Sequence, residues 1–262
     1  MKDITELLNL PLVASSHGHE IDMMMYLVHI LMAVLFIGWG TFFLVTLVKF
    51  NRRANPKANY YGVKSHVSTT LEIAVAVLEA VLLVGFSIPF WAKQVNAFPN
   101  RSDVVEIRVA AEQFAWNAHY PGADGIFGNT SNEFFDKQSN PMGIDPNDPN
   151  GKDDFTTINK IPLPIARPAI IHLSSKDVIH SFGVPEMRAK QDAIPGVSIP
   201  TWFTPTKTGE FEVVCSQLCG IGHYYMRGVL DVKTQEEYDQ WVAEKAASAA
   251  SEESGEYDDF WN

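Results

Sequence analysis

The chain has 262 residues, of which 46% are hydrophobic and 19% charged, and its formal net charge at pH 7 is −11. The acidic excess lies entirely in residues 93–262, which carry 14 Lys or Arg against 25 Asp or Glu. An acidic surface argues against a nucleic-acid-binding protein, because phosphate backbones attract basic surfaces. It suits either a cationic partner or a general role in solubility.

Two apolar segments near the N-terminus are each long enough to cross a membrane. Residues 23–48 and 71–92 are almost continuously apolar, and at about 1.5 Å per residue either can span a hydrocarbon core of about 30 Å. The loop 49–70 has five Lys or Arg and no acidic residue, whereas residues 1–22 have one Lys and four acidic residues. The positive-inside rule therefore predicts a transmembrane hairpin, residues 23–92, with a cytoplasmic loop. Two buried core helices would not explain this charge asymmetry.

The same asymmetry predicts the compartment. We expect an integral protein of the bacterial plasma membrane, with both termini and the domain after the hairpin on the outer, periplasmic face. The start of the chain lacks a basic region before an apolar one, so a cleaved signal peptide is not predicted.

The rest of the chain has the pattern of an all-β domain. Short β-rich runs recur between Pro, Gly and Asn-Asp turns, which is typical of a sandwich or barrel. We predict this domain over 93–234, then a surface helix over 236–250 within a C-terminal segment 235–262 that ends in an acidic tail. The predicted strands are 104–111, 114–120, 169–174, 178–184, 198–203, 209–214 and 226–232.

Residues 122–160 interrupt the strand pattern and are predicted to be an insertion. The stretch Asp145–Asp154 resembles a calcium-binding loop in composition. Its spacing does not match the EF-hand template, because Pro149 stands where that loop needs a ligand. A solvated insertion is the alternative interpretation, and we favour it.

Five potential metal ligands make the most informative motif. Cys215, Cys219, His223 and Met226 share one short segment, and His180 lies 35 residues before the first cysteine. Soft sulfur ligands select copper in its lower oxidation state, and imidazole suits copper in either state. Two His, one Cys and a weak Met would complete a mononuclear blue-copper site. The surplus thiolate instead indicates two coppers bridged by two thiolates, a dinuclear centre for one-electron transfer.

Other uses of these residues fit less well. A cysteine pair outside the cytoplasm is usually a disulfide, but the neighbouring His and Met residues would then have no role. Zinc accepts two Cys and two His and has no use for Met226. A thioredoxin-like copper chaperone also has two Cys separated by three residues, but there the pair precedes the distant His, whereas here it follows His180.

Several motifs together resemble those of subunit II of haem–copper terminal oxidases of the cytochrome c oxidase type. The resemblance covers the two-helix anchor and nearly all of the outer domain. It rests on Leu71-Glu72-Ile73, the aromatic run 113–121, Asp177-Val-Ile-His-Ser-Phe, Lys190-x-Asp192-Ala-Ile-Pro-Gly and the segment 215–226. It implies a cupredoxin-like sandwich or barrel, so the expected fold is a transmembrane hairpin, this all-β domain and a short C-terminal helix.

The resemblance also implies a cofactor and a reaction. The family carries a dinuclear copper centre, CuA, whose ligands correspond to His180, Cys215, Cys219, His223, Met226 and the backbone carbonyl of Gln217. A c-type cytochrome, soluble or complex-bound, gives single electrons to this centre, which passes them to haem a in subunit I. There oxygen is reduced to water and protons are pumped. The chain is thus expected to be part of an oxidoreductase and translocase with subunits I and III, and not to act on oxygen alone.

Four positions depart from the family pattern. Gln217 stands where many relatives have a Glu that helps to bind magnesium at the subunit I interface, which puts the magnesium, but not the carbonyl ligand, in doubt. Phe114 stands where the family often has the Trp that receives electrons. Trp116 remains, so electrons are expected to arrive through one of these two rings. His119 replaces an acidic docking residue, and Val75 replaces a Trp.

Two glutamates lie in the predicted second transmembrane helix, where ionisable residues are functional candidates by default. In relatives, the residue that matches Glu72 opens a proton-uptake path into subunit I, and we predict that role here. A carboxylate solvated by lipid headgroups is the alternative. Glu79 lies deeper, so it is expected to be protonated or paired with a polar group of subunit I.

Two other functions share parts of the pattern. Quinol oxidase subunit II keeps the fold but has lost copper, and the intact ligand set argues against it. A membrane-tethered copper carrier would hand metal on. The sequence does not name the donor: the acidic domain and tail would attract a soluble basic cytochrome, whereas the missing Trp favours a donor held beside the oxidase, which we expect. The acidic tail residues are Glu252, Glu253, Glu256, Asp258 and Asp259.

Overall fold

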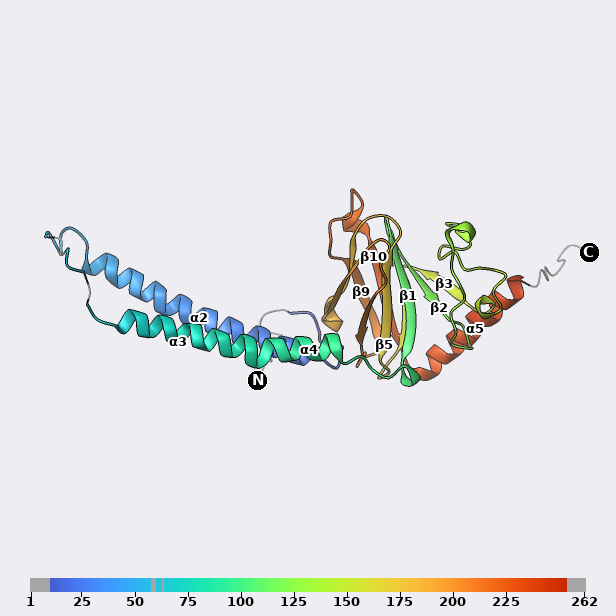
Figure 1. Cartoon of the computed structure of the whole chain (residues 1–262), viewed down its shortest axis with the longest axis horizontal. Helices are drawn as coiled ribbons and strands as arrows, with labels where there is room; N and C mark the ends of the chain where they lie inside the picture. Colours follow the sequence, from blue (N-terminus) through green and yellow to red (C-terminus); the bar gives the residue numbers. More distant parts are fainter. Residues whose placement is uncertain (1–9, 58–59, 63, 254–262) are drawn as a thin grey trace, which may run out of the picture. The chain divides into compact units, whose positions relative to one another are not determined.

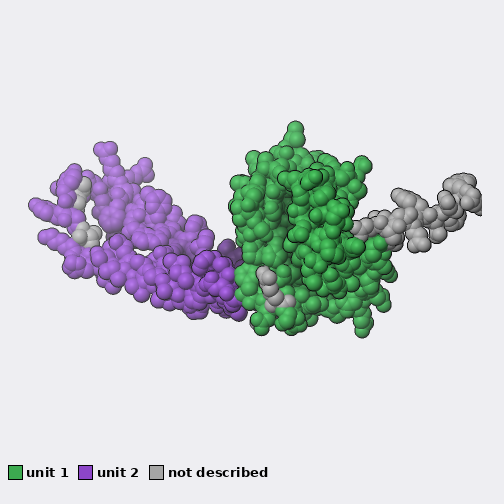
Figure 2. Space-filling model, turned by 45° about the vertical axis from the view of Figure 1, so that its right-hand side comes forward, with its two compact units in different colours: residues 1–18, 98–262 green, residues 19–97 purple. Residues whose placement is uncertain are grey.

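The computed structural model describes residues 10–57, 60–62 and 64–253. It divides into two compact units, shown in different colours in Figure 2. One unit comprises Met1–Gly18 with Phe98–Asn262, and the other comprises His19–Ala97. Three acidic residues of the predicted tail, Glu256, Asp258 and Asp259, lie outside the described residues.

The unit His19–Ala97 is a pair of long antiparallel helices that lie side by side (Figure 1). The first is α2 (Gly18–Lys49); the second consists of α3 (Val67–Leu82), a π-helical turn η1 (Leu83–Ser87) and α4 (Ile88–Asn96). Both are long and apolar enough to cross a membrane, and their apolar side chains are exposed. Such surfaces need a lipid or protein environment. The predicted pair of apolar helices is confirmed, with each helix several residues longer than predicted.

The larger unit is a sandwich of two five-stranded sheets. Their strand orders are β3-β2-β1-β5-β8 and β4-β10-β9-β6-β7. The pairs β1–β5 and β4–β10 are parallel, and the others are antiparallel. This confirms the predicted all-β, cupredoxin-like domain. The strands are β1 (Val105–Glu112), β2 (Ala115–Tyr120), β3 (Phe155–Ile158), β4 (Lys160–Pro164), β5 (Ala169–Ser175), β6 (His180–Val184), β7 (Ala189–Ala193), β8 (Ile199–Phe203), β9 (Gly209–Cys215) and β10 (Arg227–Lys233).

Three of these strands were not predicted, and all three are edge strands: β3, β4 and β7. They are four or five residues long, and β4 contains both Pro162 and Pro164. An edge strand is bonded on one side only, so it tolerates prolines that a sequence pattern counts against a strand. Of the three, β3 lies within the predicted insertion 122–160, and β4 begins at its last residue.

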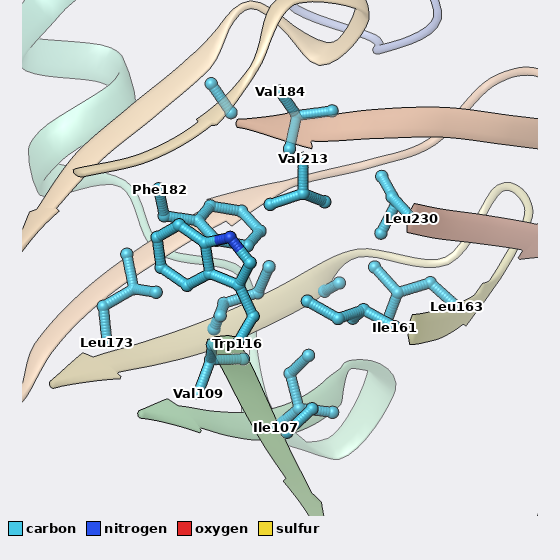
Figure 3. Packing of buried hydrophobic residues seen from close by; sticks show 14 of the residues in the cluster. Ile107, Val109, Trp116, Ile161, Leu163, Leu173, Phe182, Val184, Val213 and Leu230 are labelled. Atoms are coloured by element: carbon cyan, nitrogen blue, oxygen red, sulfur yellow. The ribbon is translucent and has the colours of Figure 1, made fainter. Parts of the chain in front are cut away.

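The core lies between the sheets, where inward-facing side chains alternate along each strand. On β1 these are Ile107, Val109 and Ala111, all buried. Figure 3 shows Trp116 among these aliphatic side chains and next to Phe182 of the opposite sheet. The two aromatic rings meet edge to face with centroids 5.4 Å apart. Trp116 is thus a central core residue.

Turn hydrogen bonds hold the loops of 122–154. Asp148 Oδ2 accepts from the backbone N–H of Asn129, and Asp153 Oδ2 accepts from Ala123 and Asp124. Carboxylates that cap backbone N–H groups in this way favour turns. Turn formation therefore accounts for the presence of Asp148 and Asp153 in this segment.

The C-terminal helix and the segment before α2 both pack on the sandwich. Helix α5 (Gln235–Glu253) begins at a capping box, in which Glu237 N donates to Thr234 Oγ1 and Thr234 N donates to Glu237 Oε2. Its Trp241 ring meets Tyr120 and Phe155 edge to face. The predicted helix 236–250 is therefore confirmed. At the other end of the chain, the N–H of Ala14 donates to the carbonyl of Glu186 at 2.8 Å.

Candidate metal centre

Neighbouring strands of one sheet bring the predicted ligands together. Strand β9 ends at the predicted ligand Cys215, and the loop from there to β10, the ligand loop, carries three more predicted ligand side chains: Cys219, His223 and Met226. Strand β6 starts at His180 and pairs with β9, with Phe182 opposite Cys215. This register places the distant histidine beside the loop. A rigid sheet thus positions ligands that the loop supplies.

The ligand atoms lie within metal-binding distance of one another. Cys215 Sγ is 3.8 Å from Cys219 Sγ and 3.9 Å from His180 Nδ1. Met226 Sδ is 3.1 Å from His180 Nδ1 and 3.8 Å from Cys219 Sγ. His223 Nδ1 is 3.5 Å from Cys219 Sγ. Two ligands bound to one metal at about 2.0–2.3 Å lie about 3–4 Å apart, so these separations fit shared metal ions.

Gln217, whose backbone carbonyl is a predicted ligand, also lies in the ligand loop. Its backbone carbonyl oxygen lies 3.1 Å from Cys215 Sγ, while the residue itself is exposed. The carbonyl is therefore available as a ligand, and the side-chain amide is not needed for that purpose.

Burial affects the protonation of the Cys219 thiol. His180, Cys215, Cys219 and Met226 are all buried, whereas His223 is half-buried. Burial, together with the neighbouring Cys215 thiol, raises the pKa of Cys219 to about 11. A metal must displace that proton, because thiolate is the binding form. Metal binding by Cys219 would therefore release a proton.

Asp177 holds the His180 ring in position. His180 Nε2 lies 2.8 Å from Asp177 Oδ1, so the opposite nitrogen, Nδ1, is directed to the sulfur atoms. Asp177 also accepts from the backbone N–H of Gln113 and Val178 at 2.7 and 2.6 Å. Partial burial acts to raise the pKa of Asp177, but the hydrogen bonds from His180 and these N–H groups lower it overall.

Asp177 and Gln113 were not among the predicted site residues. The side chain of Gln113 donates from Nε2 to the carbonyl of Cys219 at 2.6 Å. Both residues lie inside motifs that carry the resemblance, and Asp177 stands three residues before His180. That proximity in sequence was the available signal, since metal-bound histidines usually have a carboxylate or carbonyl partner.

The two aromatic residues predicted to receive electrons lie in different surroundings. The Phe114 ring is half-buried and packs under the ligand loop, where a Cβ added at Gly222 would come within 2.3 Å of its Cδ2. Trp116 is completely buried, with its ring centroid 6.3 Å from that of His180. Of the two rings, only that of Phe114 lies near the surface.

The remaining predicted positions lie outside the ligand cluster. His119 is fully buried and its Nε2 lies 2.6 Å from Asp154 Oδ2, so it is not exposed for docking. Glu72 is exposed on α3, where its Oε1 accepts from Ser68 Oγ at 2.8 Å. Glu79 is exposed farther along the same helix.

The donor set of three sulfur atoms and two imidazoles fits copper. Among the described residues, the group of His, Cys, Asp and Glu side chains close enough to hold a metal is His180, Cys215 and Cys219. The excess of soft sulfur over carboxylate ligands disfavours magnesium and calcium.

Comparisons with known proteins point to one family. The family model for the periplasmic domain of cytochrome c oxidase subunit II matches residues 105–233. The alternative cytochrome c oxidase subunit 2 of Bradyrhizobium diazoefficiens is 32% identical over 217 residues, which are 82% of this chain and 74% of that protein. A probable cytochrome c oxidase subunit 2 of Rickettsia bellii is 31% identical over 207 residues, 79% of this chain and 72% of that protein.

Solved structures include a similar domain. The periplasmic domain of subunit II of cytochrome oxidase of Bradyrhizobium japonicum is 29% identical, with a TM-score of 0.42; the match covers 58% of this chain and 99% of that one. The sequence relatives show the family, and the cluster of His180, Cys215 and Cys219 suggests a copper site. The chain belongs to the cytochrome c oxidase subunit II family of haem–copper oxidases.

Proposed function

We propose that this chain transfers electrons one at a time through a dinuclear copper centre. The supporting observation is that two thiol sulfurs lie 3.8 Å apart with an imidazole nitrogen beside each. Both thiolates would be shared by the two ions. His180 and Met226 would complete one ion, because their ligand atoms are 3.1 Å apart. His223 and the carbonyl of Gln217 would complete the other.

The protein supplies a rigid, dry ligand cage. Bound copper would provide the one-electron redox chemistry, and the thiolates of Cys215 and Cys219 would hold it. The buried ligands exclude water, and Asp177 and Gln113 fix the ring of His180 and the carbonyl of Cys219. A cage held by these contacts is expected to move little when the charge changes, which keeps the barrier to transfer low.

The exposed part of the ligand loop supports transfer between proteins. Leu218, Ile221, Tyr224 and Tyr225 are 76%, 102%, 71% and 80% exposed. Exposed apolar and aromatic side chains are typical of protein interaction sites. We propose that a c-type cytochrome gives electrons to this domain and that haem a of subunit I receives them, for oxygen reduction coupled to proton pumping. Subunits I and III would be the membrane partners.

Phe114 is the proposed ring for electron uptake, because it packs under the ligand loop and is partly exposed. Trp116 is buried and could act only as an inner bridge towards His180. Magnesium is not assigned to Gln217, since a neutral amide is a weaker ligand for this ion than a carboxylate.

The topology supports an outer location for both termini and a proton-uptake role for Glu72. The segment before α2 is bonded to the copper-bearing domain through Ala14. Glu72 lies five residues from Val67, at the end of the span nearest to the basic loop. We propose that it takes up protons on the cytoplasmic side.

The copper count of the full chain in detergent tests the dinuclear proposal. We expect two coppers per chain and a purple, mixed-valence spectrum, and less copper in both Cys215→Ser and Cys219→Ser. Ser216→Ala, an exposed neighbour in the same loop, is the matched control and should keep both ions. One copper with a blue spectrum would contradict the proposal, and no copper at all would favour a quinol oxidase-like subunit.

A further inference from the structure

Glu79 lies close to the middle of the second transmembrane span. This span runs from Val67 to Asn96, and Glu79 is 12 residues after its start and 17 before its end. At about 1.5 Å per residue, these intervals are about 18 and 26 Å, so the carboxyl group lies inside a hydrocarbon core of about 30 Å.

The hairpin itself offers this carboxyl no polar partner. Glu79 is exposed, and within the described part of the chain its carboxyl makes no hydrogen bond or ion pair. Glu20 and Lys93 are 2.6 Å apart at one end of the antiparallel pair. Glu79 lies 14 residues before Lys93, and Val34 lies 14 residues after Glu20, so Glu79 and Val34 are at about the same level. The residues of α2 around Val34 are all apolar. His29 is five positions before Val34 on α2, which is about 7.5 Å along the helix axis.

A carboxyl group at this depth does not face lipid. Ionisable residues in transmembrane helices almost always face other protein or water, and pair with a polar group there. Glu79 is exposed although Val75 and Leu82, one turn away on either side, are partly buried, so the group that covers the carboxyl must come from elsewhere in the assembly.

The surroundings of Glu79 suit the close approach of another helix. Ala76 and Ala80 flank it with small side chains, which allow helices in membranes to pack closely. Glu72, seven residues earlier, lies on the same side of the helix. The π-helical turn begins one turn later, at Leu83, whose N–H contacts the carbonyls of Glu79 and Ala80. Such turns occur frequently at functional sites.

We propose that the α3 face carrying Glu79 docks a transmembrane helix of another oxidase subunit, which presents a hydrogen-bond donor to the Glu79 carboxyl. This inference rests on the chain being one subunit of a membrane complex and does not depend on the copper centre. The hydrocarbon interior of the bilayer offers no such donor. The contact fixes where along its length the hairpin meets its partner.

Co-purification of the intact complex through a tag on this chain tests the proposal. Glu79→Leu should lower the recovery of the partner membrane subunits several-fold, although it makes the helix more apolar. Glu79→Gln keeps an acceptor oxygen and should retain most of them. Val81→Leu, an exposed apolar position on the opposite side of the helix, is the control. Unchanged recovery with Glu79→Leu would overturn the proposal, because a lipid-facing position gains from leucine.

A photo-crosslinking residue provides a second readout that does not require Glu79 to change. Placed at Ala76, on the Glu79 side, it should give adducts with another membrane subunit; at Val77, on the opposite side, it should give few. Adducts from Ala76 with lipid alone, or with a second copy of this chain, would overturn the proposal. The copper content of the same samples tests the metal-centre proposal. A failure of that proposal can therefore be distinguished from a failure of the docking proposal.

Discussion

The Nε2 of His180 donates a hydrogen bond to Oδ1 of Asp177 over 2.8 Å, which leaves Nδ1 of the same ring directed at the sulfur ligands. A carboxylate behind a metal-bound imidazole fixes the ring orientation and increases the basicity of the ligand. Asp177 is itself held by two backbone N–H groups. The ligand is therefore positioned before metal binds.

Removing this carboxylate should weaken copper binding. We expect Asp177→Ala to lower copper affinity by about 10- to 100-fold, since partners of metal-bound histidines have effects of this size. Asp177→Asn keeps an acceptor oxygen and should lose less. Competition with a copper chelator gives the affinity, and Asp148→Asn in the insertion is a control of equal charge change. Equal affinities for all the proteins would exclude the positioning role.

Met226 should tune the centre without being essential to it. We expect Met226→Leu to keep both coppers and to raise the reduction potential, because the oxidised form loses a weak electron-donating ligand. Onward electron transfer should slow. Met187→Leu, another fully buried methionine of the same core, is the control. Loss of all copper from Met226→Leu would contradict the role of a weak ligand.

Phe114 and Gly222 form a tight contact that should be sensitive to one added methyl group. A Cβ at position 222 would lie 2.3 Å from Phe114 Cδ2, so Gly222→Ala should destabilise the copper domain by about 1–3 kcal/mol through overpacking. Phe114→Ala in the same chain should recover part of this loss. Thermal unfolding of the single and double variants measures the coupling, and additive effects would show that the ring and loop do not press on each other.

The buried pair of His119 and Asp154 predicts a pH dependence of stability. Burial lowers the pKa of His119, although the hydrogen bond and charge of Asp154 act in the opposite direction. The unfolded chain, with a His pKa of about 6.5, then binds this proton more readily than the folded chain. Stability is therefore full above about pH 6.5 and falls below it, by up to about 1.4 kcal/mol per pH unit.

His119→Gln removes this contribution. The unfolding free energy of the variant, measured in the same metal state, should fall less between pH 7 and pH 5 than that of the unmodified protein. Parallel curves for the two proteins would show that another group causes the acid sensitivity.

Ionic strength separates the two classes of electron donor. The acidic domain would attract a soluble basic cytochrome, an attraction screened over about 8 Å at physiological ionic strength. We expect a donor held beside the oxidase, so oxygen uptake by the intact complex should change little with salt. Fast turnover with added soluble cytochrome c that falls steeply with salt would contradict this expectation. Phe114→Trp should then speed electron uptake further.

The sequence by itself determined the pair of long apolar helices, the β-rich class of the outer domain and the residue types of the predicted copper site. These follow from local properties: apolar length and flanking charge for residues 23–92, alternation for the strands, and the chemistry of the predicted ligands for the segment 215–226. The tertiary structure decided which atoms meet. His180 joins the loop only because β6 pairs with β9. The edge strand β4 forms because pairing with β10 stabilises it more than its two prolines destabilise it. The burial of Trp116 and His119 depends on side chains that only folding brings together, so it has no local signal in the sequence.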